Sequence, residues 1–141
     1  MSYTQEFTET HELLERLPPL TYNGGVSTNW FAVNDYHRVI VIVSAGTLTG
    51  TLDAAVFQAT NLAGAGAKAV TGKAITQLAA GHDEYISGIE IRTEELDVDG
   101  GFDCLRVQTV SSAVNVFEVI VFGLIPRYAA VGVTEWDEVV H

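Results

Sequence analysis

The sequence predicts an all-β fold: an antiparallel β-sandwich, with a jelly roll as one candidate topology, preceded by an N-terminal arm or short helix. Two observations carry this prediction. From residue 21 onward, short runs rich in β-branched and aromatic residues recur at regular spacing, separated by glycine and other turn residues. The same region contains no helical periodicity sustained over about ten residues, as an amphipathic helix would require.

The N-terminal segment differs in character and predicts a unit of its own. Residues 3–17 can form a helix, because Ser2 and Gln5 match a capping box and the prolines at 18–19 would end it. We therefore divide the chain into an N-terminal arm, 1–20, and a β-sandwich domain, 21–141. Glutamate recurs every three residues in the arm, which favours a solvated acidic face. The alternative is a docking arm that becomes ordered on a partner through four apolar residues, Phe7, Leu13, Leu14 and Leu17.

The strands of the domain are expected where β-branched and apolar residues cluster between turn signals. These clusters predict strands at 37–45, 51–59, 73–78, 85–94, 102–110 and 114–123. Weaker patterns predict further strands near 28–34 and 130–134. The glycine- and alanine-rich stretch 60–72 predicts a long loop.

Two of these strands are apolar on both faces, which bears on assembly. In an antiparallel sandwich with one solvated face, apolar and polar residues alternate, as they do at 89–92. Residues 39–43 and 119–122 do not alternate, so their second face needs cover from the arm, from a long loop or from another subunit. We therefore expect a symmetric homo-oligomer.

A single domain fits the length, and the charge limits the partners. A chain of 141 residues can bury one sizeable core, and its single cysteine, Cys104, excludes an intramolecular disulfide. The 18 acidic and 7 basic residues give a formal net charge of -11, which disfavours nucleic acid and anionic membrane surfaces as partners. The first residues lack the basic and apolar regions of a signal peptide, so we expect synthesis in a reducing cytoplasm.

The segment R-T-E-E-L-D-V-D-G-G-F at 92–102 places carboxylates before two glycines and predicts a hairpin turn at Asp99, Gly100 and Gly101. Asp-Gly pairs supply the positive φ angles that tight turns need. The EF-hand calcium pattern fails, because it requires an oxygen ligand followed by glycine where this sequence has glycine followed by phenylalanine. A calcium site of another type stays open. A catalytic pair of Glu94 and Glu95 is disfavoured, because neighbours on a strand point to opposite faces.

The remaining motifs do not predict catalysis, a metal site or a cofactor. G-A-G-A-K-A at 64–69 lacks the strand-loop-helix context of a dinucleotide site. H-E-L-L-E at 11–15 has glutamate where the zinc-protease motif has its second histidine. Cys104 lies in an expected strand with alternating apolar and polar residues, where a buried, unreactive thiol is usual. Trp30 and Trp136 fit core anchors better than sugar-binding platforms. We therefore expect a protein that is not an enzyme.

Five blocks of the sequence occur in order between residues 36 and 128: Y-H-R-V-I-V, G-T-L-D-A, G-A-G-A-K-A-V-T-G-K-A-I-T-Q-L, I-R-T-E-E-L-D-V-D-G-G-F and G-L-I-P-R-Y. Together they resemble a family of small structural proteins of tailed bacteriophages and prophages, encoded among the head genes. The block that ends in D-V-D-G-G-F is the most specific of the five.

The resemblance implies a non-enzymatic virion protein that binds the outside of a phage capsid as a decoration or cement protein and stabilises the shell. It implies a homo-oligomer, with a trimer favoured, that binds the major capsid protein. It also implies synthesis in the cytoplasm of a bacterial host and a final location on the capsid surface. The docking arm would then bind the shell. Two alternatives stay open: a neck or tail-completion component, and a carbohydrate-binding β-sandwich module.

Overall fold

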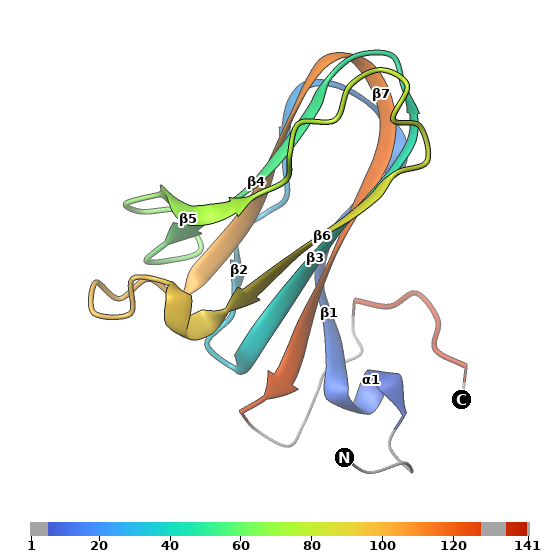
Figure 1. Cartoon of the computed structure of the whole chain (residues 1–141). Coiled ribbons are helices and arrows are strands. Elements are labelled where there is room, and N and C mark those ends of the chain that lie inside the picture. The colour runs from blue at the N-terminus through green and yellow to red at the C-terminus, as the bar shows by residue number, and fades with distance from the viewer. Residues whose placement is uncertain (1–5, 128–134, 141) are drawn as a thin grey trace.

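The computed structural model describes residues 6–127 and 135–140 and contains one seven-stranded antiparallel sheet that folds over into two facing layers (Figure 1). The predicted all-β sandwich with a short N-terminal helix is confirmed. The elements are α1 (Phe7–Thr10), β1 (His11–Ser27), β2 (Phe31–Ala32), β3 (Tyr36–Leu48), β4 (Leu52–Ala59), β5 (Lys68–Ala74), β6 (Ile86–Arg92), a 3-10 helix (Thr93–Glu95) and β7 (Cys104–Pro126). None of the helices in these residues is long and apolar enough to cross a membrane.

The long strand β7 runs through both layers. Its first half pairs with β4 and its second half pairs with β3, so the sheet order is β5-β4-β7-β3-β6. The strand bends between these halves, where the β3–β4 turn crosses it. There the amide of Asn115 accepts hydrogen bonds from the backbone N–H groups of Thr49 and Gly50, at 3.0 and 3.1 Å, and donates to the carbonyl of Thr51 at 3.0 Å. These bonds fix the turn on the strand and set the two layers face to face.

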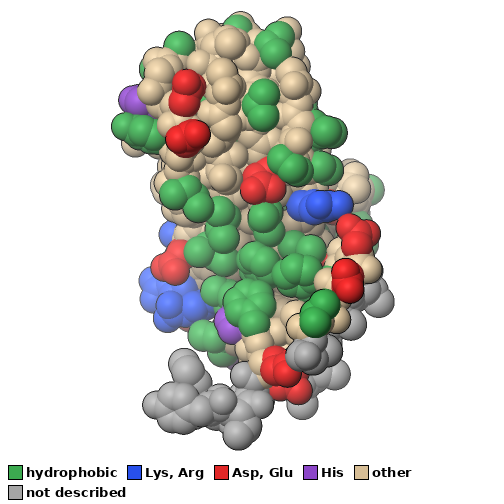
Figure 2. All heavy atoms as spheres, turned by 90° about the vertical axis from the view of Figure 1, so that its right-hand side faces the viewer, with side chains coloured by type: hydrophobic (Ala, Val, Ile, Leu, Met, Phe, Trp, Pro, Cys, Tyr) green, Lys and Arg blue, Asp and Glu red, His purple; other side chains and the backbone are tan. Residues whose placement is uncertain are grey.

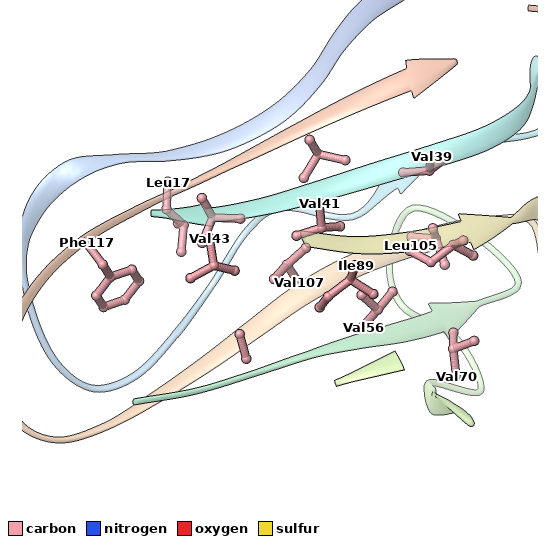
Figure 3. Close-up of a cluster of buried hydrophobic side chains, with 14 of the residues drawn as sticks. Leu17, Val39, Val41, Val43, Val56, Val70, Ile89, Leu105, Val107 and Phe117 are labelled. Carbon is pink, nitrogen blue, oxygen red and sulfur yellow. The ribbon is translucent and has the colours of Figure 1, made fainter. Parts of the chain in front are cut away.

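The core lies between the layers, and valine is its most frequent residue. Strand alternation turns Val39, Val41 and Val43 of β3 inward, and each is fully buried. They pack with Val56 of β4 and Val107 of β7 (Figure 3). Burying each such side chain stabilises the fold by about 1.5–3 kcal/mol. The β-branched runs that predicted these strands therefore also supply the core.

The expected N-terminal arm is wrong for residues 11–20. These residues begin β1, which pairs with β7 from His11↔Leu124 to Ser27↔Gln108, so the boundary at residue 20 falls inside a strand of the domain. The helix is limited to α1, Phe7–Thr10. Among the described strands, β1 pairs with β7 alone, and its register shifts between Leu17 and Leu20, where ladder hydrogen bonds are interrupted. The two prolines are tolerated for these two reasons.

Other strand boundaries differ from the prediction as well. The strand expected at 73–78 is replaced by β5, Lys68–Ala74, most of which lies in the stretch predicted as a loop. The strands expected at 102–110 and 114–123 are one continuous strand, β7. The strand expected at 28–34 is reduced to β2, and the one expected at 130–134 lies outside the described residues. Residues 111–113 are small and lack large apolar side chains, so the sequence predicts two strands where the structure has one.

The hairpin predicted at Asp99, Gly100 and Gly101 is wrong, although a turn is present there. Strand β6 pairs with β3 rather than with β7, so residues 93–103 carry the chain from one layer to the other. Gly101 has a φ of 78°, as a turn glycine should. The carboxylate of Asp97 accepts a hydrogen bond from the backbone N–H of Gly100 at 3.0 Å and closes the turn.

Candidate interaction surfaces

The outer face of β3 and β7 carries an apolar surface, which we call the apolar face and define as Ile40, Ile42, Ile120, Phe122 and Leu124. The register places Ile40 opposite Phe122 and Ile42 opposite Ile120, so these side chains form adjacent cross-strand rows. All five are partly exposed. Figure 2 shows hydrophobic side chains gathered on this side of the molecule, with charged side chains around them.

One margin of the apolar face is covered by the ends of the chain. The ring of Phe7, from α1, meets Phe122 edge-on at 5.4 Å, and the ring of Trp136 lies 5.9 Å from Phe122. His11 stacks on Phe7 at 4.2 Å. A cavity of about 270 Å³ between Trp136, Leu13 and Ile120 lies at this margin. The N-terminal segment thus supplies part of the cover that the second face of β7 needs, and Ile40 and Ile42 lie on the part of the face formed by β3.

The four residues predicted as a docking arm do not form one exposed surface. Leu13 and Leu17 are only 7% and 8% exposed, because β1 places them against its own domain. Leu14 is half-buried and packs against the core. Phe7 is 52% exposed and is the member of the set that remains accessible. The four residues share one side only in a helix, and residues 11–27 form strand β1 instead.

A second surface, which sequence reasoning missed, is a basic pocket where β3 begins and where β6 and β7 end. The pocket has a volume of about 590 Å³. Three arginines, Arg38, Arg92 and Arg127, line it together with His37, one glutamate, Glu94, and the side chains of Thr93, Val98 and Ile125. The three arginines lie at separate strand ends, and only the sheet register brings them together.

The charges around this pocket are unevenly paired. Glu95 accepts hydrogen bonds from Lys73 at 2.8 Å and from Arg92 at 2.9 Å, and these two cations hold the pKa of its carboxyl at about 2. The guanidinium of Arg92 also lies 3.5 Å from Glu94. Arg127 donates a hydrogen bond to the Thr93 hydroxyl at 3.0 Å. Within residues 6–127 and 135–140, neither Arg38 nor Arg127 forms an ion pair.

The remaining candidates occupy structural positions. Glu94 and Glu95 lie in the 3-10 helix rather than on a strand, and both contact Arg92. The thiol of Cys104 is buried, and burial and the neighbouring Asp103 raise its pKa to about 11. Trp30 lies under the Arg106 guanidinium, 4.6 Å from its ring. In the described part of the chain, we find no group of three or more His, Cys, Asp or Glu side chains that could hold a metal ion.

Comparison with known proteins gives no family. No family model matches the chain, and no curated protein is significantly similar to it. Among solved structures, the chain is similar to Bacillus endospore appendages, described as a novel family of disulfide-linked pili, with a TM-score of 0.38 and 13% identity over 89% of this chain and 99% of that chain. It is also similar to a chain of the infectious bursal disease virus Gt strain, with a TM-score of 0.27 and 11% identity over 83% of this chain and 40% of that chain. At these TM-scores neither similarity carries an argument about function, and the resemblance to phage head proteins stays a prediction.

Proposed function

We propose that this protein is a non-enzymatic structural protein of a phage particle that binds the outside of the capsid as a decoration protein. In this role it assembles with further copies of itself, which pack through the apolar face. The five sequence blocks between residues 36 and 128 support the phage context. The geometry of the apolar face supports assembly.

One observation carries this function: large apolar side chains occupy adjacent cross-strand rows on an outer sheet face. The strands beneath them are interior strands, since β3 pairs with β6 and β7, and β7 pairs with β3 and β1. Their backbone groups are therefore satisfied within the sheet, and a partner placed on this face would meet side chains alone. Removing this apolar surface from water is favourable by roughly 25 cal/mol per Å².

Most of the predicted docking arm cannot make the contact with the capsid. Leu13 and Leu17 are buried in the domain and cannot reach a shell without unfolding β1. Phe7 and α1 lie at the rim of the apolar face, and the 52% exposed ring of Phe7 remains accessible to a partner there.

The copy number in purified particles tests the proposal. Quantitative mass spectrometry of particles of the encoding phage would measure the ratio of this chain to the major capsid protein. We expect a ratio close to parity, as a lattice-wide decoration protein requires. A few copies per particle would replace the proposal with a neck or tail component, and absence from the particles would overturn the structural role altogether.

A further inference from the structure

The basic pocket stands out because the chain as a whole is acidic. Four of its 7 basic residues, Arg38, Lys73, Arg92 and Arg127, lie in or beside this pocket, although the formal net charge of the chain is -11. A smaller cavity of about 280 Å³, lined by Lys73, Glu90 and Glu95, shares Arg38 and Arg92 with it. The two cavities therefore adjoin at Arg38 and Arg92, where β3 begins and β6 ends, and we call them together the groove.

Two arginines in the groove face each other at close range. The register pairs Arg38 with Arg92. The backbone of Ala45 donates to the carbonyl of Tyr85, so alternation along the two strands makes Arg38 and Arg92 a non-hydrogen-bonded pair, in which side chains come closest. Like charges directly opposite each other destabilise a sheet. Glu94 and Glu95 balance Arg92, whereas Arg38 has no carboxylate partner in the described residues.

Arg127 also lines the pocket and forms no ion pair with the described residues. Its guanidinium is oriented by the Thr93 hydroxyl, which in turn donates to the carbonyl of Tyr36 at 2.9 Å. Among the described residues, the carboxylates that line these two cavities are Glu90, Glu94 and Glu95, and Glu95 is already bound by Lys73 and Arg92.

The wall between these charges is apolar and strained. Val98 and Ile125 line the pocket and are 61% and 54% exposed. Ile125 has a φ of 53°, a left-handed conformation that a β-branched residue adopts only at a cost of about 1–3 kcal/mol.

We propose that this basic pocket binds an acidic polypeptide segment whose carboxylates meet Arg38 and Arg127 and whose apolar side chains cover Val98 and Ile125. Arginine binds carboxylates with paired, charge-assisted hydrogen bonds. A volume of about 590 Å³ with an apolar wall is larger than an inorganic phosphate needs. The charge of -11 repels any polyanion at longer range, so a short segment with a few carboxylates matched to Arg38 and Arg127 fits the pocket better than a continuous nucleic acid backbone. This site stands independently of the capsid role.

Fluorescence anisotropy tests the site on the full chain. The probe is a fluorescein-labelled peptide that alternates glutamate with leucine, and the control probe has glutamine at each glutamate position. We expect saturable binding of the acidic probe at low ionic strength, weakened by salt, and weak binding of the control probe. Equal binding of both probes, or no saturation, would overturn the proposal. Displacement of the probe by equimolar inorganic phosphate would also overturn it, since it would indicate a simple anion site.

Charge-reversal variants locate the binding. We expect R38E and R127E each to weaken binding of the acidic probe by about tenfold. R16E is the matched control, because Arg16 lies outside the groove and makes an exposed ion pair with Asp137 at 3.7 Å. R38E should also keep or raise the urea midpoint, since it replaces a like-charge pair with an attractive one facing Arg92. Unchanged binding in folded R38E and R127E would place the peptide elsewhere and refute the site.

Discussion

The aromatic ring of Tyr36 lies directly against the backbone of Gly123, so that a Cβ atom at position 123 would come within 2.8 Å of three atoms of the ring. Tyr36 begins β3, and Gly123 of the neighbouring strand β7 pairs with Val39 of β3. Tyr36 is buried, so its ring cannot swing into solvent to make room. The glycine is required here by close approach.

This contact predicts a large loss of stability in G123A. Overpacking of a buried site costs about 1–3 kcal/mol, because the ring or the strand must shift. The urea midpoint of unfolding measures the loss. G25A is the matched control, since a Cβ at Gly25 meets nothing within 4 Å, and its midpoint should stay close to that of the unmodified chain. Equal midpoints for the two variants would show that the ring can move freely.

Replacing Asn115, at the bend of β7, should also cause a large loss of stability. Its side chain is fully buried and makes three hydrogen bonds to the backbone of the β3–β4 turn. N115A leaves two backbone donors and one acceptor to find new partners in a partly buried turn, where each unmet group costs about 1–3 kcal/mol. N61A is the control, because Asn61 accepts two comparable backbone hydrogen bonds in an exposed loop. Thermal unfolding should show a markedly larger decrease in Tm for N115A, and similar decreases would contradict the role of the bend.

Some parts of the fold can be predicted from the sequence, and the surroundings of Gly123 and Asn115 cannot. The run at 39–43 predicted β3 correctly because its β-branched residues fit a buried strand and no competing signal is present. The residues H-E-L-L-E-R-L at 11–17 favour a helix by intrinsic propensity, but pairing with β7 along the whole of β1 overrides that weak preference. Neither the bend at Asn115 nor the place of Gly123 beneath Tyr36 leaves a local sequence signal, because each depends on a partner far along the chain.

The two candidate surfaces also differ in how well the sequence predicts them, because one depends on local pattern and the other on residues far apart in the chain. The apolar face follows from local pattern, since 39–43 and 119–122 lack the alternation of a strand with one solvated face. The basic pocket does not, because Arg38, Arg92 and Arg127 come from three separate strand ends. Only the register of β3 with β6 and β7 brings their charges together.

The ion pairs of Glu95 predict a loss of stability in acid. Lys73 and Arg92 lower the pKa of this carboxyl from 4.5 to about 2. A carboxyl with a lowered pKa in the folded state stabilises that state above its unfolded pKa, and this contribution is lost as the pH falls from about 4.5 towards 2. Urea midpoints measured across this range should therefore fall less steeply in E95Q than in the unmodified chain.

A matched control separates this effect from general acid unfolding. Glu90 is an exposed carboxylate on β6 that forms no ion pair in the described residues, so E90Q should follow the unmodified chain across the same pH range. If E95Q and E90Q have the same acid profile, the ion pairs of Glu95 do not contribute to stability.

The apolar face predicts that one charge will prevent self-association without unfolding the chain. Ile42 lies in the middle of this face, between Gly88 of β6 and Ile120 of β7, and its side chain is partly exposed in the single chain. In I42E the carboxylate can remain hydrated in the monomer, whereas an interface between copies would have to desolvate it. We expect an oligomeric mass for the unmodified chain and a monomeric mass for I42E in sedimentation velocity. The matched control is V110E.

Val110 is 46% exposed and lies on the half of β7 that pairs with β4. If I42E keeps the oligomeric mass while V110E loses it, copies pack through the other layer of the sandwich. A monomeric mass for the unmodified chain at all concentrations would show that the apolar face does not bind a second copy.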